Sequence, residues 1–110
     1  MHYHGHGVIE NFSIAVNWYR KTAEQGHAIA QCDLGWLYEV GYGVEKNYIT
    51  AAEWYRKAAE QNHAISQYYL GQMYEYGRGI GQNISTAAEW YRKAAELGYA
   101  PAQRKVDHST

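Results

Sequence analysis

Three tryptophans, Trp18, Trp54 and Trp90, lie 36 residues apart in the chain. The segment TAAEWYRKAAE occurs without change at 50–60 and at 86–96, and a related version, SIAVNWYRKTAE, occupies 13–24. Self-similarity at a fixed period of about 20 to 50 residues indicates a repeat architecture, in which each copy packs mainly on its neighbours. This period constrains the fold more than any other feature of the sequence.

Each period predicts two helices, which we name A and B. In the second copy, helix A is expected over 28–40 and helix B over 48–61, with GYGVEKN as the loop between them. The apolar face of helix B recurs at helical spacing. It consists of Tyr48, Ala51, Ala52, Tyr55, Ala58 and Ala59, with Trp54 at its edge. On the opposite face, we expect ion pairs between residues four apart, Glu53–Lys57 and Arg56–Glu60.

Small and polar residues mark the ends and contacts of these helices. Gly35 and Gly71 lie in the middle of helix A, where glycine costs about 1 kcal/mol relative to alanine, so we expect close packing against helix B there. Asn47 suits the N-cap of helix B. Asn62 follows helix B where the other copies have glycine, which predicts a left-handed residue. The next helix begins near Ala64, and so short a connection predicts antiparallel neighbours.

The chain is therefore predicted to be one all-α domain, a superhelical α/α solenoid of antiparallel helix pairs. We expect about five full helices and a short C-terminal helix. The predicted units are 1–27 (partial repeat, a loop plus helix B), 28–63 and 64–99 (complete repeats), and 100–110 (partial repeat or capping helix). Asp107 takes the place of the packing glycine in the last unit. Apolar surface at the incomplete ends predicts self-association, or a chain that is part of a longer array.

The residues shared between copies identify a family resemblance. In the second copy they are Ala30, Leu34, Gly35, Tyr38, Gly41, Gly43, Val44, Asn47, Ala51, Trp54, Tyr55, Ala58 and Ala59. This pattern, A-x-x-x-L-G-x-x-Y-x-x-G-x-G-V-x-x-N followed by W-Y-R-K-A-A-E, resembles the Sel-one-like repeat, a relative of the tetratricopeptide repeat. The resemblance covers nearly the whole chain. It implies a superhelix whose A helices line a concave groove, used in adaptor and scaffold roles.

From that resemblance, the A-helix positions not used for packing are expected to face a protein or peptide partner. They are Ile29, Cys32, Trp36, Glu39, Ile65, Tyr68, Gln72, Glu75 and Arg104. Trp36 stands out because its counterpart is Gln72, so packing does not require an aromatic side chain at this position. We consider two interpretations of Trp36: an anchor for a partner segment, or a side chain that packs on a neighbouring loop.

Other kinds of site have weaker support. His2, His4 and His6 share one face if the segment is extended, which suits Zn²⁺ or Ni²⁺, but a terminal run that binds metal only adventitiously is the interpretation we favour. We therefore expect no metal site and no cofactor. Acidic and basic residues are interspersed at a net charge of −1, which argues against nucleic-acid binding. No apolar run approaches the length of a membrane span.

The function that we expect is that of a protein-interaction module rather than an enzyme. One alternative is a structural spacer within a longer array. The least favoured alternative is a β-lactamase-like enzyme, since cysteine-rich relatives are associated with β-lactams but carry paired cysteines in each repeat. This chain has one cysteine, Cys32. A single cysteine leaves the compartment open, with a lean towards the reducing cytoplasm.

Overall fold

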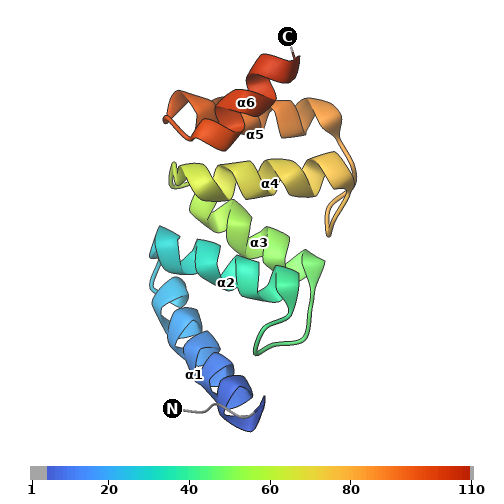
Figure 1. The fold of residues 1–110 in the computed structure, drawn as a ribbon. Coiled ribbons are helices and arrows are strands. Elements are labelled where there is room, and N and C mark those ends of the chain that lie inside the picture. The colour runs from blue at the N-terminus through green and yellow to red at the C-terminus, as the bar shows by residue number, and fades with distance from the viewer. Residues whose placement is uncertain (1–4, 110) are drawn as a thin grey trace.

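Six helices follow one another in a stacked array (Figure 1). The computed structural model describes the backbone of residues 5–109 and the side chains of residues 14–107. The helices are α1 (Gly5–Glu24), α2 (Ala28–Val40), α3 (Tyr48–Ala59), α4 (Ala64–Tyr76), α5 (Ile84–Glu96) and α6 (Ala100–Ser109). Each helix packs chiefly on its neighbours in sequence, within an envelope of 49 × 28 × 25 Å. Over 5–109 no strand occurs, and the predicted all-α solenoid is confirmed.

The residues predicted to cap or end the helices have the expected conformations. The side chain of Asn47 accepts a hydrogen bond from the Thr50 amide at 3.1 Å, as expected of an N-cap. Gly41 ends α2 in the left-handed region, with φ of 79°. Asn62 has a φ of 63°, and it is the non-glycine residue with positive φ within the described backbone. Helix α3 ends at Ala59 rather than at residue 61, because the chain already turns towards this left-handed residue.

The predicted loop in the first unit is wrong for the part that the structure describes. Helix α1 begins at Gly5, so residues equivalent to the loop 41–47 are helical. In the complete repeats the loop is tied to helix A, since the Asn47 amide donates to the Tyr38 carbonyl at 2.9 Å and Asn83 does the same to Tyr74. The position equivalent to Tyr38 in the first unit is His2, which lies outside the described residues.

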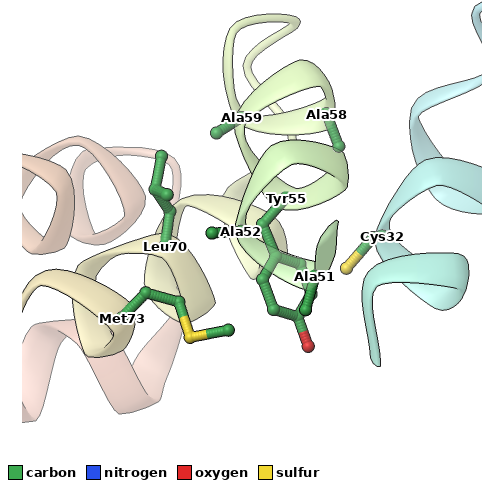
Figure 2. Close-up of a cluster of buried hydrophobic side chains, with 8 residues drawn as sticks. All are labelled: Cys32, Ala51, Ala52, Tyr55, Ala58, Ala59, Leu70 and Met73. Carbon is green, nitrogen blue, oxygen red and sulfur yellow. The ribbon is translucent and has the colours of Figure 1, made fainter. Parts of the chain in front are cut away.

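Glycine and tyrosine form the contact between the helices of each complete repeat. A Cβ at Gly35 would lie 2.8 Å from a ring atom of Tyr55, and one at Gly71 would lie 2.8 Å from Tyr91. The close packing predicted from the glycines is confirmed, although the nearest group is the tyrosine ring rather than an alanine. Figure 2 shows this core around Tyr55, with the small side chains of α3 and with Leu70 and Met73 of α4.

A glutamine, buried in the two complete repeats and exposed in the last unit, joins each repeat to the next. The side-chain amide of Gln31 donates to the Ala23 carbonyl at 3.1 Å, and Gln67 donates to the Ala59 carbonyl at the same distance. Gln103 makes the equivalent bond to Ala95 at 3.2 Å. Each bond adds a second donor to a carbonyl at the C-terminal end of a B helix, which also accepts from a backbone amide of the following turn. This shared bond explains why glutamine recurs at this position.

The two ion pairs predicted along α3, Glu53–Lys57 and Arg56–Glu60, are not formed. Arg56 instead donates a hydrogen bond to the Tyr74 hydroxyl of α4. The Lys57 ammonium lies 5.2 Å from the Trp54 ring centroid, and Lys93 lies 4.8 Å from that of Trp90. Contacts with aromatic rings therefore replace the salt bridges, because tyrosine and tryptophan side chains lie within reach of these cations.

Candidate functional site

A groove of 610 Å³ crosses α2 and reaches α1 on one side and α4 on the other. Its walls are mainly apolar, with one carboxyl group and one imidazole. The lining residues are Ala15, Tyr19, Ile29, Cys32, Asp33, Trp36, Leu37, His63, Ile65 and Tyr69. Its size and lining suit apolar side chains of a bound segment.

Four of the residues expected to face a partner lie together in this groove. Ile29, Trp36 and Ile65 expose 68%, 39% and 40% of their surface, respectively. Cys32 is only 4% exposed and belongs to the core cluster around Tyr55. Burial, together with the charge of Asp33, raises the pKa of the Cys32 thiol to about 12. Its sulfur is therefore protonated at neutral pH and forms part of the groove floor rather than a reactive group.

Trp36 combines the two arrangements considered for it. Its ring meets that of Tyr42 edge to face, with centroids 5.5 Å apart, and Tyr42 lies in the loop between α2 and α3. The same indole lines the groove. Gln72, its counterpart in α4, donates a hydrogen bond to the Tyr68 hydroxyl at 3.3 Å instead. Loop packing therefore fixes the orientation of Trp36 and leaves part of its surface open.

The other predicted residues lie further along the array. Tyr68 and Arg104 line a second hollow of 380 Å³ between α4 and α6, together with Pro101 and Lys105. The Tyr68 ring also packs 5.4 Å from that of Tyr91. Six of the nine predicted residues thus lie in two hollows, an apolar one at α2 and a basic one at α6. Glu75 lines a separate hollow beside Tyr91, and Glu39 and Gln72 line neither of the two.

Glu39 and Glu75 connect helices as well as facing outward. Glu39 accepts a hydrogen bond from the Tyr55 hydroxyl at 2.6 Å and lies 3.5 Å from Arg78. Glu75 accepts from Tyr91 at 2.5 Å and from Lys105 at 3.0 Å. Partial burial raises the pKa of Glu75, but the hydrogen bonds from Tyr91 and Lys105 outweigh it and leave the pKa below its usual value. Each carboxylate therefore helps to join its A helix to helix B.

Six groove residues were not among those expected from the sequence: Ala15, Tyr19, Asp33, Leu37, His63 and Tyr69. Ala15 and Tyr19 belong to the apolar face of helix B, which is buried in the core where a helix A covers it. Asp33 was detectable in principle, because its counterparts are Tyr69 and Lys105, and three different residue types at one position indicate that the shared packing does not dictate it.

Among the described residues, no three His, Cys, Asp or Glu side chains come together in a way that would hold a metal ion. His2, His4 and His6 lie outside the described side chains. Among the helices between Gly5 and Ser109, none is both long enough and apolar enough to pass through a membrane.

Known proteins and structures identify the relatives of this chain. The Sel1 repeat model matches residues 1–27, 28–63 and 64–99. No curated protein is similar enough to be matched. Among solved structures, a Sel1 repeat protein from Oxalobacter formigenes is 39% identical with a TM-score of 0.83, covering 86% of this chain and 71% of that one. Cysteine-rich protein B of Helicobacter pylori is 30% identical with a TM-score of 0.76, covering 79% and 65%.

A third structure, c5321, is a protective antigen of uropathogenic Escherichia coli strains that displays an SLR fold. It is 35% identical with a TM-score of 0.84, and the match covers 87% of this chain but only 21% of the antigen. Repeats of this kind generally serve as protein-interaction modules and non-catalytic scaffolds. The resemblance noted from the sequence is confirmed, because the family model matches three consecutive segments from residue 1 to 99: the chain belongs to the Sel1 repeat family.

Proposed function

We propose that the chain is an adaptor module that binds a protein or peptide along its A helices, with the groove over α2 as the main contact. The observation that carries this proposal is the exposure of Ile29, Trp36 and Ile65 in one apolar groove of 610 Å³. Large apolar side chains gathered in a hollow mark interaction sites more often than scattered ones do.

The Trp36 indole is the expected anchor. Its contact with Tyr42 holds the ring in one orientation, so binding costs little side-chain entropy. Partly exposed tryptophans in such settings are frequent hot spots. Tyr68, with Arg104 beside it, extends the contact surface to the hollow at α6.

Site-specific photo-cross-linking tests this proposal. A benzophenone amino acid placed at Ile29 should cross-link to a partner in cell extract, whereas the same probe at Glu53, on the exposed face of α3, should not. A Trp36→Ala, Tyr68→Ala double substitution should reduce the yield of the Ile29 cross-link by about tenfold or more. The helical circular dichroism spectrum should be retained.

The spacer alternative makes the opposite prediction. If the chain only separates other domains, the probes at Ile29 and Glu53 will give the same products, and the double substitution will change neither. Equal cross-linking from the two positions would therefore contradict the adaptor proposal.

A further inference from the structure

The A helices α2, α4 and α6 carry different residue pairs at the same two positions of the repeat (Figure 1). The pairs are Cys32 and Asp33 in α2, Tyr68 and Tyr69 in α4, and Arg104 and Lys105 in α6. The first pair contains an acid, the second is aromatic and the third is basic. The hollows follow the same order, because the groove of 610 Å³ contains Asp33 whereas the hollow of 380 Å³ contains Arg104. The binding surface is therefore polarised in charge along the array.

Arg104 carries the uncompensated charge of the hollow at α6. The neighbouring Lys105 ammonium lies 3.0 Å from the Glu75 carboxylate, so its charge is already paired. The Arg104 side chain is exposed, and none of the side chains of residues 14–107 forms an ion pair or hydrogen bond with it. No acid lines the hollow, which is formed by Tyr68, Pro101, Arg104 and Lys105. A group bound there would therefore meet a guanidinium whose N–H donors are available.

Tyr68 offers a second donor in the same hollow. Its hydroxyl oxygen accepts a hydrogen bond from the Gln72 side-chain amide at 3.3 Å, which leaves the hydroxyl hydrogen for another acceptor. The rings of Tyr91 and Tyr99 both lie 5.4 Å from the Tyr68 ring, centroid to centroid, so the position of Tyr68 is fixed before a ligand binds. A hydroxyl and a guanidinium that both donate match a carboxylate, because an ionised carboxylate only accepts.

The groove at α2 disfavours the same ligand group. Asp33 lies in its lining, and no lysine or arginine lies there with it. Burial raises the pKa of the Asp33 carboxyl, and the nearby charge of His63 only partly offsets this rise. A carboxylate brought into the groove would add a like charge beside an acid that is already poorly solvated. Apolar parts of a bound segment are therefore directed to the groove at α2, and acidic parts to the hollow at α6.

We infer that the hollow at α6 binds an aspartate or glutamate side chain of a partner protein, held by Arg104 and Tyr68. An apolar side chain of the same segment fills the groove at α2. The planar guanidinium can donate to both oxygens of a carboxylate, an arrangement that a lysine ammonium does not reproduce. This inference rests on the proposed function and specifies the partner chemistry: an acidic segment rather than a basic or wholly apolar one.

Selection of displayed random peptides on the intact chain tests this inference. Peptides of about 12 residues extend to about 40 Å, a length comparable to the 49 Å of the array. Among the peptides that bind, Asp and Glu should be enriched at least about threefold over Lys and Arg, as expected of one partly exposed charge pair. Arg104→Gln should abolish this enrichment and Arg104→Glu should reverse it. Arg92→Gln is the matched control, because it removes the same charge from an exposed position of α5 outside both hollows, and it should leave the enrichment unchanged.

A selected acidic peptide then shows which carboxylate binds. It is synthesised with an amidated C-terminus, so that its side chains carry all of its carboxylates, and its affinity is measured by fluorescence anisotropy. The amidated peptide should bind, and Tyr68→Phe should weaken its binding by about threefold, since that change removes one hydrogen-bond donor and keeps the ring.

Several outcomes would overturn the inference: no acidic enrichment, an enrichment that survives Arg104→Gln, or one that Arg92→Gln removes equally. Loss of binding on amidation would show that a terminal carboxylate, rather than a side chain, is the ligand. Sedimentation that shows a dimer dissociated by Arg104→Glu would make a second copy of the chain the occupant instead. The self-association predicted from the incomplete ends is examined by the same measurement.

Failure here is distinguishable from failure of the adaptor proposal. If the selected peptides lack acids but the Ile29 cross-link still depends on Trp36 and Tyr68, only the acidic site is wrong. If acidic peptides bind through Arg104 but the probes at Ile29 and Glu53 give the same products, only the groove at α2 is wrong.

Discussion

Tyr55 and Tyr19 occupy the same place in two copies of one repeat, yet their surroundings differ. Tyr55 is fully buried between the glycine of α2 and the small side chains of α3, and its hydroxyl donates to Glu39. Tyr19 belongs to the same type of helix but faces the groove. The comparison teaches that the same residue type in this repeat is fully buried where a helix A lies on it and only half-buried in α1.

The largest expected effect comes from truncating these two tyrosines. Tyr55→Ala should lower the free energy of unfolding by about 3–5 kcal/mol, because a fully buried aromatic side chain leaves a cavity. Tyr19→Ala should cost less than about half as much, since part of the ring is already in water. Urea unfolding followed by circular dichroism measures both, and equal losses would contradict the difference in packing.

Adding a methyl group to the helix contact should have the next largest effect. Gly71→Ala places a Cβ 2.8 Å from the Tyr91 ring and should destabilise the chain by about 1–3 kcal/mol. Gly81→Ala is the matched control, because no heavy atom lies within 4 Å of its Cβ, and it should change stability by less than about 0.5 kcal/mol. Thermal melts of both variants measure these changes. Helix propensity alone predicts that Gly71→Ala raises stability, so a loss of stability would show that the close contact with Tyr91 dominates.

One difference between the complete repeats predicts a stabilising change. The Gln31 side-chain oxygen accepts a hydrogen bond from Gln61 at 2.9 Å, whereas the equivalent oxygen of Gln67 is buried without a protein donor among the described residues. The position equivalent to Gln61 is Leu97, which is exposed. Leu97→Gln should therefore raise the free energy of unfolding by about 0.5–1.5 kcal/mol. Leu97→Ala is the control, and an equally large gain in its free energy of unfolding would contradict the hydrogen-bond explanation.

The smallest effect concerns pH. Because the folded pKa of Glu75 lies below its unfolded value, its contribution to stability is present above pH 4.5, the usual pKa, and is lost as the pH falls through the folded pKa. The stability difference between wild type and Glu75→Gln should therefore shrink on acidification below that value. Tyr91→Phe removes one donor and should reduce the same pH dependence. A difference that stays constant from pH 7 to about pH 3 would show that the carboxylate charge is not stabilising.

Local residue signals made the helix pairs predictable. Asn47 and Asn62 marked helix ends because capping and left-handed conformations depend on a few neighbouring residues. Gly35 indicated close packing for the same reason, since a mid-helix glycine needs a compensating contact. These requirements recur in every copy, so the repeat itself displayed them.

The surface features were less predictable, since they depend on neighbours that the repeat pattern does not specify. The pairing of Arg56 with Tyr74 requires knowing how far α4 lies from α3. The helical start of α1 at Gly5 departs from the repeat register, which placed loop residues there. Asp33 was not expected in the groove, although the different residue types at its position, Asp33, Tyr69 and Lys105, indicate that the shared packing does not dictate it.

Amide hydrogen exchange tests most directly whether an A helix protects each B helix. Measured on the monomer with mass-spectrometric detection, amides of α1 between residues 14 and 23 should exchange at least about tenfold faster than those of α3. Equal protection of α1 and α3 in the free monomer would contradict the account, since an uncovered helix would then be as stable as a covered one.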